Sequence, residues 1–243
     1  MLKKSVLFSL FSLIGILAIG QEPDKGQFDE KARKVQEEIL DTKKVEIENL
    51  KVLHKDGAIY LEGVAGLYGS RHLAEEKALK VKGVTSVDNQ IAVTRGDVSD
   101  LDIETQIMAK IRSHLRGTPF DLVSVKVNNG FVLLRGNVRD QTLVKDSFES
   151  AIWVRGVRGV ENRIDMASVG SGDERLRQGI YNRLSREFQQ YFVGRYPSIL
   201  IIVNSSRVEL VGYVDSNVSR EKILSIVRSF PGVLSVINNL QTN

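Results

Sequence analysis

The stretch Gly130–Ile164, GFVLLRGNVRDQTLVKDSFESAIWVRGVRGVENRI, decides the fold of this 243-residue chain. It opens with a glycine and an alternating apolar strand, and it closes with a helix end, a glycine and another strand. The pattern recurs upstream as GAIYLEGVA and VKGVTSVDNQI, and downstream as SRVELVGYV and FPGVLSVINNL. Three landmarks repeat with shared offsets of 73 and then 76 residues: Gly63, Gly136 and Gly212; Gly83, Gly156 and Gly232; and Asn89, Asn162 and Asn238. Shared offsets over three landmarks indicate three copies of one unit.

Each unit carries the periodicity of two helices and three strands in the order α-β-β-α-β. Apolar residues at i, i+4 spacing predict the helices, and alternation of apolar and polar residues predicts the strands. The pairs Asp56-Gly57 and Asn129-Gly130 predict tight turns between the first two strands of their units. We therefore expect an α+β fold in which each unit is a three-stranded mixed sheet with two helices on one face.

The expected elements follow by residue number. The first unit has helix 30–41, strands 45–55 and 58–65, helix 71–82 and strand 84–94. The second has a helix capped by Asp102, strands 122–128 and 131–138, helix 141–155 and strand 157–166. The third has helix 173–192, strands 199–204 and 207–214, helix 217–230 and strand 233–241. We interpret the strand glycines, Gly63 and its two counterparts, as sites where the helices lie close. The repeated asparagines are expected to bond local backbone, with a metal or ligand role as the alternative.

The first residues predict a leader. Lys3 and Lys4 precede an uncharged run of 16 residues that ends at Gly20. That run is short of the roughly 20 residues that span a bilayer, and Ala18 and Gly20 suit cleavage before Gln21. We expect a signal peptide at 1–20, a flexible tether at 21–29 and units at 30–95, 101–167 and 173–243; an uncleaved anchor is the alternative. The chain has no cysteine, so exported units of this size depend on their cores alone.

Charge and motifs exclude several classes of function. The formal charge of +4 falls to +2 without the two leader lysines, which is too weak to indicate a nucleic-acid partner. Residues 172–243 are the most basic unit, with nine Lys and Arg against six Asp and Glu. The three histidines fall at unrelated places in the repeat, and there is no HExxH, GxSxG or P-loop motif. We expect no catalytic residues, no metal site and no cofactor.

Comparison of the units with one another singles out apolar residues of the second unit. Phe148 and Trp153 stand where the first unit has Glu75 and Lys80. Phe131 and Leu133 alternate with core positions, so their side chains are expected to face away from the helices. One interpretation is that neighbouring units dock on these four side chains, because exposed apolar patches are rare in monomers. The other is a site for lipid or for a partner protein.

A second candidate is the third-unit segment 183–197, RLSREFQQYFVGRYP. Aromatic side chains that sit among arginines suit the headgroup region of an anionic membrane. The alternative is ordinary packing of the aromatic side chains beneath a long loop. The candidate lipid-binding residues are Arg183, Arg186, Tyr191, Phe192, Arg195 and Tyr196.

The repeated pattern G-x-V-x-L-x-G-x-V, helix, V-x-G-V-x-x-V-x-N-x-I resembles the BON (bacterial OsmY and nodulation) domain. The second unit matches best, at Gly130, Val132, Leu134, Gly136, Val138, Val154, Gly156, Val157, Val160, Asn162 and Ile164. The other units depart from it at Ala65, at Ser206 and at Phe230-Pro231. The resemblance covers nearly all of the chain beyond the leader. It implies the α-β-β-α-β fold, the bacterial envelope, binding of phospholipid or other envelope components, and no catalysis.

These observations together predict an exported, non-enzymatic protein of the periplasm, soluble or peripherally attached to a membrane. It is expected to associate with anionic phospholipid and to support envelope integrity or osmotic and stress tolerance. The alternative is a protein-interaction scaffold or a chaperone-like factor that binds envelope proteins without contacting lipid.

Overall fold

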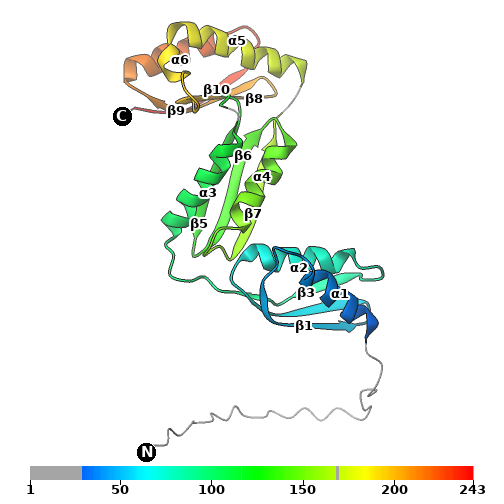
Figure 1. The fold of residues 1–243 in the computed structure, drawn as a ribbon. Coiled ribbons are helices and arrows are strands. Elements are labelled where there is room, and N and C mark those ends of the chain that lie inside the picture. Colours follow the sequence, from blue (N-terminus) through cyan, green and yellow to red (C-terminus); the bar gives the residue numbers. More distant parts are fainter. Residues whose placement is uncertain (1–28, 116, 168–169, 243) are drawn as a thin grey trace, which may run out of the picture.

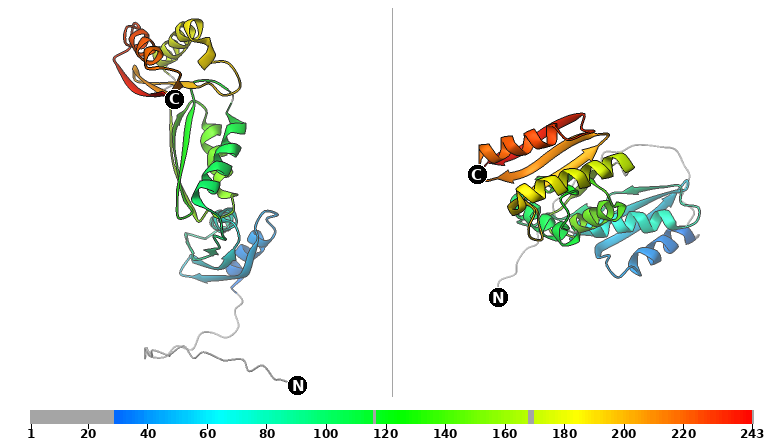
Figure 2. Two further views of the ribbon diagram at one scale, coloured as in Figure 1. Left: turned by 90° about the vertical axis from the view of Figure 1, so that its left-hand side faces the viewer. Right: turned by 90° about the horizontal axis from the view of Figure 1, so that it is seen from above.

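A computed structural model describes residues 29–115, 117–167 and 170–242. The three units follow one another along the length of the molecule, and in each one the helices cover a single face of a small sheet (Figures 1 and 2). The predicted α+β class and the predicted order within each unit are confirmed. The expected signal peptide and most of the expected tether lie outside the described residues.

Each unit uses its second strand as the centre of its sheet. The first unit contains α1 (Glu30–Leu40), β1 (Ile47–Lys55), β2 (Ala58–Ala65), α2 (Tyr68–Lys80), β3 (Ser86–Asn89) and β4 (Ala92–Val93). The strand β1 pairs antiparallel with β2, and both β3 and β4 pair parallel with β2. The expected strand 84–94 is therefore split in two, and the expected helix 71–82 begins three residues earlier.

The second and third units repeat this topology with an unbroken third strand. The second unit contains α3 (Asp100–His114), β5 (Leu122–Asn128), β6 (Phe131–Val138), α4 (Gln141–Ile152) and β7 (Gly159–Met166). The third contains α5 (Ser171–Glu187), the 3-10 turn η1 (Gln189–Tyr191), β8 (Ile199–Asn204), β9 (Arg207–Val214), α6 (Asn217–Arg228) and β10 (Ser235–Thr242). The sheet orders are β5-β6-β7 and β8-β9-β10. In each sheet the first pair of strands is antiparallel, and the second pair is parallel.

Local chemistry explains most of the boundaries. Asn129 and Gly130 both have positive φ, 50° and 78°, which is the geometry that the predicted tight turn requires. The predicted cap Asp102 is wrong: the hydroxyl of Ser99 accepts the Asp102 N–H at 3.1 Å and donates to its carboxylate at 2.6 Å. Ser99 is thus the cap, and Asp102 lies in the first turn. The expected helix 173–192 is shorter than predicted, since it gives way to η1 after Glu187.

Three separate cores hold the units. The first is built around Ile39, Ile59 and Leu61, and the second around Ile103, Ile107 and Leu134. The third is the largest and takes in Ile180, Leu184 and Leu210, together with aromatic side chains of the loop after α5. Buried side chains alternate along each central strand, so the strand face away from the helices remains open.

The strand glycines have a different cause from the one that the sequence suggested. A Cβ at Gly136 would lie 2.0 Å from the carbonyl oxygen of Leu122, and a Cβ at Gly212 would lie 1.9 Å from that of Ser198. The backbone of the neighbouring hairpin strand, and not a helix, therefore excludes a side chain at these positions. The repeated asparagines do bond local backbone: the Oδ1 of Asn162 accepts the Ile164 N–H, and its Nδ2 donates to the Val144 carbonyl.

Candidate functional site

The junction between the first two units is built on Trp153. This residue caps α4, and its indole ring lies against Gly69 in the first turn of α2, where a Cβ would come within 2.6 Å of the ring. Nearby, the rings of His72 and Phe148 meet edge to face with centroids 5.0 Å apart. The ammonium of Lys44 lies 5.8 Å from the centre of the Trp153 ring. Apolar contacts and a cation therefore join the two units here.

Phe131 and Leu133 do not belong to that helix junction. Both lie on the open face of the second sheet, as their alternation with Val132 and Leu134 predicted. Phe131 is 55% exposed, and the guanidinium of Arg158 lies 5.1 Å from its ring centre. These two side chains and Tyr68 of the first unit line one shallow hollow. The structure thus divides the four apolar residues between a unit–unit contact, made by Phe148 and Trp153, and an accessible sheet face.

The junction between the second and third units uses backbone as well as side chains. The Ile201 N–H on the edge strand β8 donates to the Pro119 carbonyl at 2.6 Å. Phe120 enters the third core and meets Tyr181 edge to face at 5.7 Å. The Tyr196 hydroxyl donates to the Arg112 carbonyl at 3.3 Å. Phe120 was not predicted as a contact residue, because a lone aromatic residue in a loop belongs to no repeating pattern.

Two of the six candidate lipid-binding residues lie in or against the third core. Tyr191 is only 6% exposed, and its hydroxyl accepts the Asp215 N–H at 3.2 Å. Phe192 is half-buried against the third core and meets Tyr181 edge to face at 5.5 Å. Tyr191 is therefore part of the third core, and Phe192 packs partly against it, as in the alternative of ordinary packing beneath a long loop.

The other four residues remain on the surface. Arg186, Arg195 and Tyr196 are exposed, and the Arg195 guanidinium lies 5.7 Å from the ring centre of Tyr196. Arg183 is also exposed, but its charge is paired with Glu187 at 2.7 Å. Val193, which the sequence analysis did not single out, is 55% exposed in the same loop. We call Arg186, Val193, Arg195 and Tyr196 the basic–aromatic patch.

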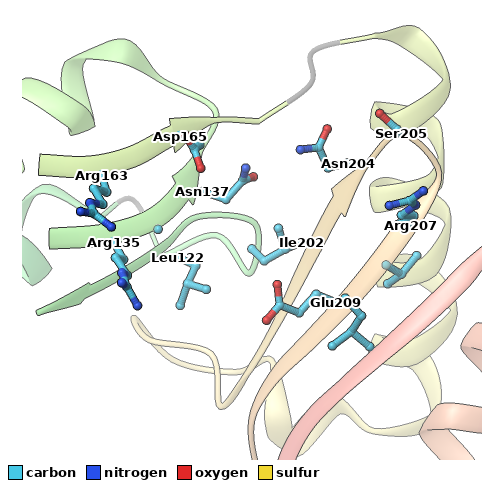
Figure 3. Close-up of a pocket in the computed structure, with 13 residues that line it drawn as sticks. Leu122, Arg135, Asn137, Arg163, Asp165, Ile202, Asn204, Ser205, Arg207 and Glu209 are labelled. Carbon is cyan, nitrogen blue, oxygen red and sulfur yellow. The ribbon is translucent and has the colours of Figure 1, made fainter.

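A cavity of about 700 Å³ lies where the open sheet faces of the second and third units meet (Figure 3). We call it the inter-unit cleft. Leu122 and Ile202 form an apolar part of its lining, while Arg135 and Arg163 from one sheet and Arg207 from the other contribute charge. None of these arginines was predicted as a site residue, although comparison of the three units contains a signal for them.

Other kinds of site find no support within the described ranges. In that part of the chain, no group of three or more His, Cys, Asp or Glu side chains is placed to hold a metal ion. The same residues form no helix that is both long enough and apolar enough to cross a bilayer.

Comparison with known proteins bears on identity. The model of the BON domain matches the chain three times, over residues 29–95, 99–168 and 172–243. No curated protein is similar enough in sequence to be matched. Among solved structures, CdsD, a structural protein of the type III secretion system of Chlamydia trachomatis, matches at 11% identity. Its TM-score is 0.24, and the match covers 86% of this chain and 90% of that one.

The C-terminal domain of the same secretion protein matches with a TM-score of 0.25, again at 11% identity, over 90% of this chain and 99% of that one. Scores this low add nothing to the assignment, which depends on the three domain matches. Because those matches span most of its length, the chain belongs to the BON domain family of envelope-associated proteins, with three tandem domains.

Proposed function

We propose that this protein works in the periplasm and attaches reversibly to anionic phospholipid, supporting the integrity of the envelope under osmotic or other stress. The basic–aromatic patch carries the proposal. Val193 and Tyr196 are 55% and 48% exposed, and the Arg195 guanidinium lies 5.7 Å from the centre of the Tyr196 ring. Arg186 is exposed in the last turn of α5, and within the described residues neither arginine forms an ion pair. Exposed apolar side chains among unpaired cations suit the interface of an anionic leaflet.

The magnitudes indicate a weak, reversible attachment. Each arginine near an anionic surface contributes about 1 kcal/mol. Partial insertion of the valine and tyrosine side chains adds roughly 1–2 kcal/mol more at 25 cal/mol per Å². A total of about 3–4 kcal/mol corresponds to a dissociation constant of roughly 1–6 mM for one copy. Such a protein exchanges between the membrane and solution, and salt weakens its binding.

Charge reversal within the patch tests the proposal. The Arg186→Glu/Arg195→Glu variant should lose more than tenfold in binding to vesicles that contain phosphatidylglycerol, because two attractions become repulsions. The matched control is Lys43→Glu/Lys82→Glu, which changes the net charge equally on exposed residues of the first unit. Flotation with vesicles measures both variants, and far-UV circular dichroism checks their folding. Equal losses in the two variants would show that only net charge matters and would remove the patch from the account.

The second candidate is a protein-interaction scaffold, and β10 is the observation in its favour. This edge strand, SVINNLQT, carries no charged residue, and Ile237 on it is 52% exposed. Edge strands normally carry charges or are covered by another part of the protein. The edge strand β8 is also uncharged, but its Ile201 N–H donates a hydrogen bond to the Pro119 carbonyl. A partner strand added to β10 would satisfy its open backbone groups. Failure of the wild-type protein to bind anionic vesicles would favour this candidate.

A further inference from the structure

The third sheet is open at one edge only within the part of the chain that the structure describes, and that edge is β10. At the other edge, β8, the Ile201 N–H donates to the Pro119 carbonyl at 2.6 Å, and the Val203 carbonyl accepts from the Arg177 guanidinium at 2.7 Å. An uncovered edge strand is a template on which another chain can pair. Pairing at a single edge joins two chains and then stops, so it gives a closed dimer and not a fibre.

The corresponding edges of the other two units carry protection that β10 lacks. The strand β7 contains Glu161, Arg163 and Asp165, and the third strand of the first unit contains Asp88 and is broken between β3 and β4. Charges and short length are two of the means by which proteins prevent edge-to-edge pairing. In contrast, β10 is eight residues long and uncharged. The third unit is therefore the one whose edge is suited to pairing.

The first unit shows how the repeated asparagine covers one backbone group at such an edge. In a parallel ladder the N–H groups of alternate residues point to the same neighbouring strand. The Gln90 N–H donates to the Leu61 carbonyl on the central strand, so the next N–H, that of Ile91, points outward. It is accepted by the Oδ1 of Asn89 at 3.2 Å. One outward N–H is thus already bonded before any partner arrives.

The same pattern determines which backbone groups of β10 are open. The N–H of Leu240, the counterpart of Ile91, is accepted by the Oδ1 of Asn238 at 3.0 Å. Val236 and Asn238 alternate in step with Leu240, so their N–H and carbonyl groups also point outward, and no described strand pairs with that side of β10. An added strand therefore finds its open partners around Ile237, before the bonded N–H of Leu240.

Exposed apolar side chains lie at the same place. Ile237 is 52% exposed on the open face of the sheet, and Leu234, just before β10, is 77% exposed. We propose that a second copy of this chain pairs antiparallel with β10 about a two-fold axis at Ile237, which joins the two third-unit sheets into one. In this register Val236 of each copy exchanges backbone hydrogen bonds with Asn238 of the other.

A second copy is the occupant because the edge matches itself. Pairing about the axis places Ile237 opposite Ile237 and Ser235 opposite Asn239, so an apolar pair forms and no like charges meet. The same surface of each copy covers the other, as two-fold contacts require. The proposal uses the strand on which the scaffold candidate rests and specifies its partner. It does not depend on attachment to lipid.

The absence of cysteine from the chain allows a direct test of the register. Residues opposite each other at a non-hydrogen-bonded position have Cα atoms about 4.5 Å apart, within the range of about 4.4–6.8 Å that a disulfide spans. Ile237→Cys should therefore form a disulfide-linked dimer under mild oxidation of the full three-domain chain. Gln241→Cys, exposed on the same face of β10, is the matched control, because its two thiols would lie roughly 27 Å apart at about 3.4 Å per residue.

Sedimentation equilibrium of the full chain without lipid measures the association itself. Because the contact is small, we expect a weak dimer with a dissociation constant on the order of 10–100 µM. Ile237→Lys places like charges opposite each other and should weaken the dimer at least tenfold. Tyr213→Lys is the matched control: it replaces a 55% exposed apolar side chain on the same face, but on the central strand β9, and should dimerise as the wild type does. Thermal melting checks that both variants fold.

Three results would overturn the proposal. They are a wild-type chain that stays monomeric at about 1 mM, self-association that Ile237→Lys leaves unchanged, and disulfide formation by Gln241→Cys as fast as by Ile237→Cys. The first would leave β10 to a strand of another protein or to no partner, and the second would place the contact on another surface. Because no lipid is present, these results are independent of vesicle binding: failure of the lipid proposal would leave the dimer standing, and failure of the dimer would leave the lipid proposal standing.

Discussion

The contact between Gly69 and Trp153 gives a prediction in which two substitutions compensate each other. An added Cβ at position 69 would lie 2.6–2.7 Å from three atoms of the indole ring, which is closer than side chains pack. Gly69→Ala therefore has to push the Trp153 ring out of its place between α4 and α2. Because this is the only tryptophan in the chain, its fluorescence reports on that junction alone.

The two single variants should each destabilise the junction. Gly69→Ala overpacks the contact, at a cost of about 1–3 kcal/mol. Trp153→Ala removes a half-buried ring and should cost roughly 1–3 kcal/mol, less than a fully buried tryptophan. In the Trp153→Ala background the clash is gone, and alanine gains up to about 1 kcal/mol over glycine in the helix α2. The double variant should therefore be more stable than Trp153→Ala alone, with a coupling free energy of about 2 kcal/mol.

Guanidinium denaturation of the wild type, both single variants and the double variant, followed by far-UV circular dichroism, measures the coupling. The indole emission of wild-type protein should be that of a ring shielded from water, and Gly69→Ala should shift it towards the emission of an exposed indole. If Gly69→Ala is as stable as the wild type and its emission is unchanged, then the ring does not dock on the first unit, and the described junction is incorrect.

Two further predictions concern the strand glycine and the turn of the second unit. Gly136→Ala, which places a Cβ 2.0 Å from the Leu122 carbonyl oxygen, should lower the free energy of unfolding by about 3 kcal/mol or more in chemical denaturation. Gly172→Ala, in the first turn of α5 with open space around it, should not lower that free energy and should raise it by up to about 1 kcal/mol. Burial raises the pKa of Asp100, but hydrogen bonds from the Gly130 and Asn129 N–H groups and the charge of Arg95 outweigh it and lower that pKa overall. Because the pKa of Asp100 is lower in the folded protein, this carboxylate stabilises the fold at pH values above its unfolded-state pKa of about 3.9, and that stability is lost as the pH falls through its folded-state pKa. The melting temperature of the wild type should therefore fall as the pH drops below about 4, and it should fall less steeply in Asp100→Asn.

The sequence predicted the hairpins of this fold better than its helix ends. Alternation and the Asn129-Gly130 turn determine the register of β5 and β6 locally, so both strands begin and end where expected. The end of α5 depends on tertiary packing, because Phe188 continues the helical spacing while the chain itself turns to place Tyr191 in the third core. The positions of the strand glycines were predicted from the sequence. The reason for glycine there was not, because a close backbone contact across a hairpin produces no sequence pattern of its own.

In the candidate sites too, features set by the local sequence pattern were predicted, and features set by tertiary packing were not. Periodicity identified Phe131 and Leu133 as outward-facing, because alternation along a strand is a local property. It did not separate the buried Tyr191 from the exposed Tyr196, since Tyr191 lies in the 3-10 turn after α5 and Tyr196 in the loop beyond it, where the period of the α-helix no longer applies. The cleft arginines were accessible to comparison of the units, but their placement around one cavity depends on how two domains dock, which the repeat does not encode.

The central claim, attachment to anionic phospholipid, is tested most directly by flotation of the wild-type protein with vesicles of matched size, either neutral or containing phosphatidylglycerol. The account predicts binding to the anionic vesicles only, falling as salt rises from about 0.05 M to 0.5 M, because exposed charges are screened beyond about 10 Å at 0.1 M. Equal binding to both kinds of vesicle, or no binding to the anionic ones at low salt, would contradict it.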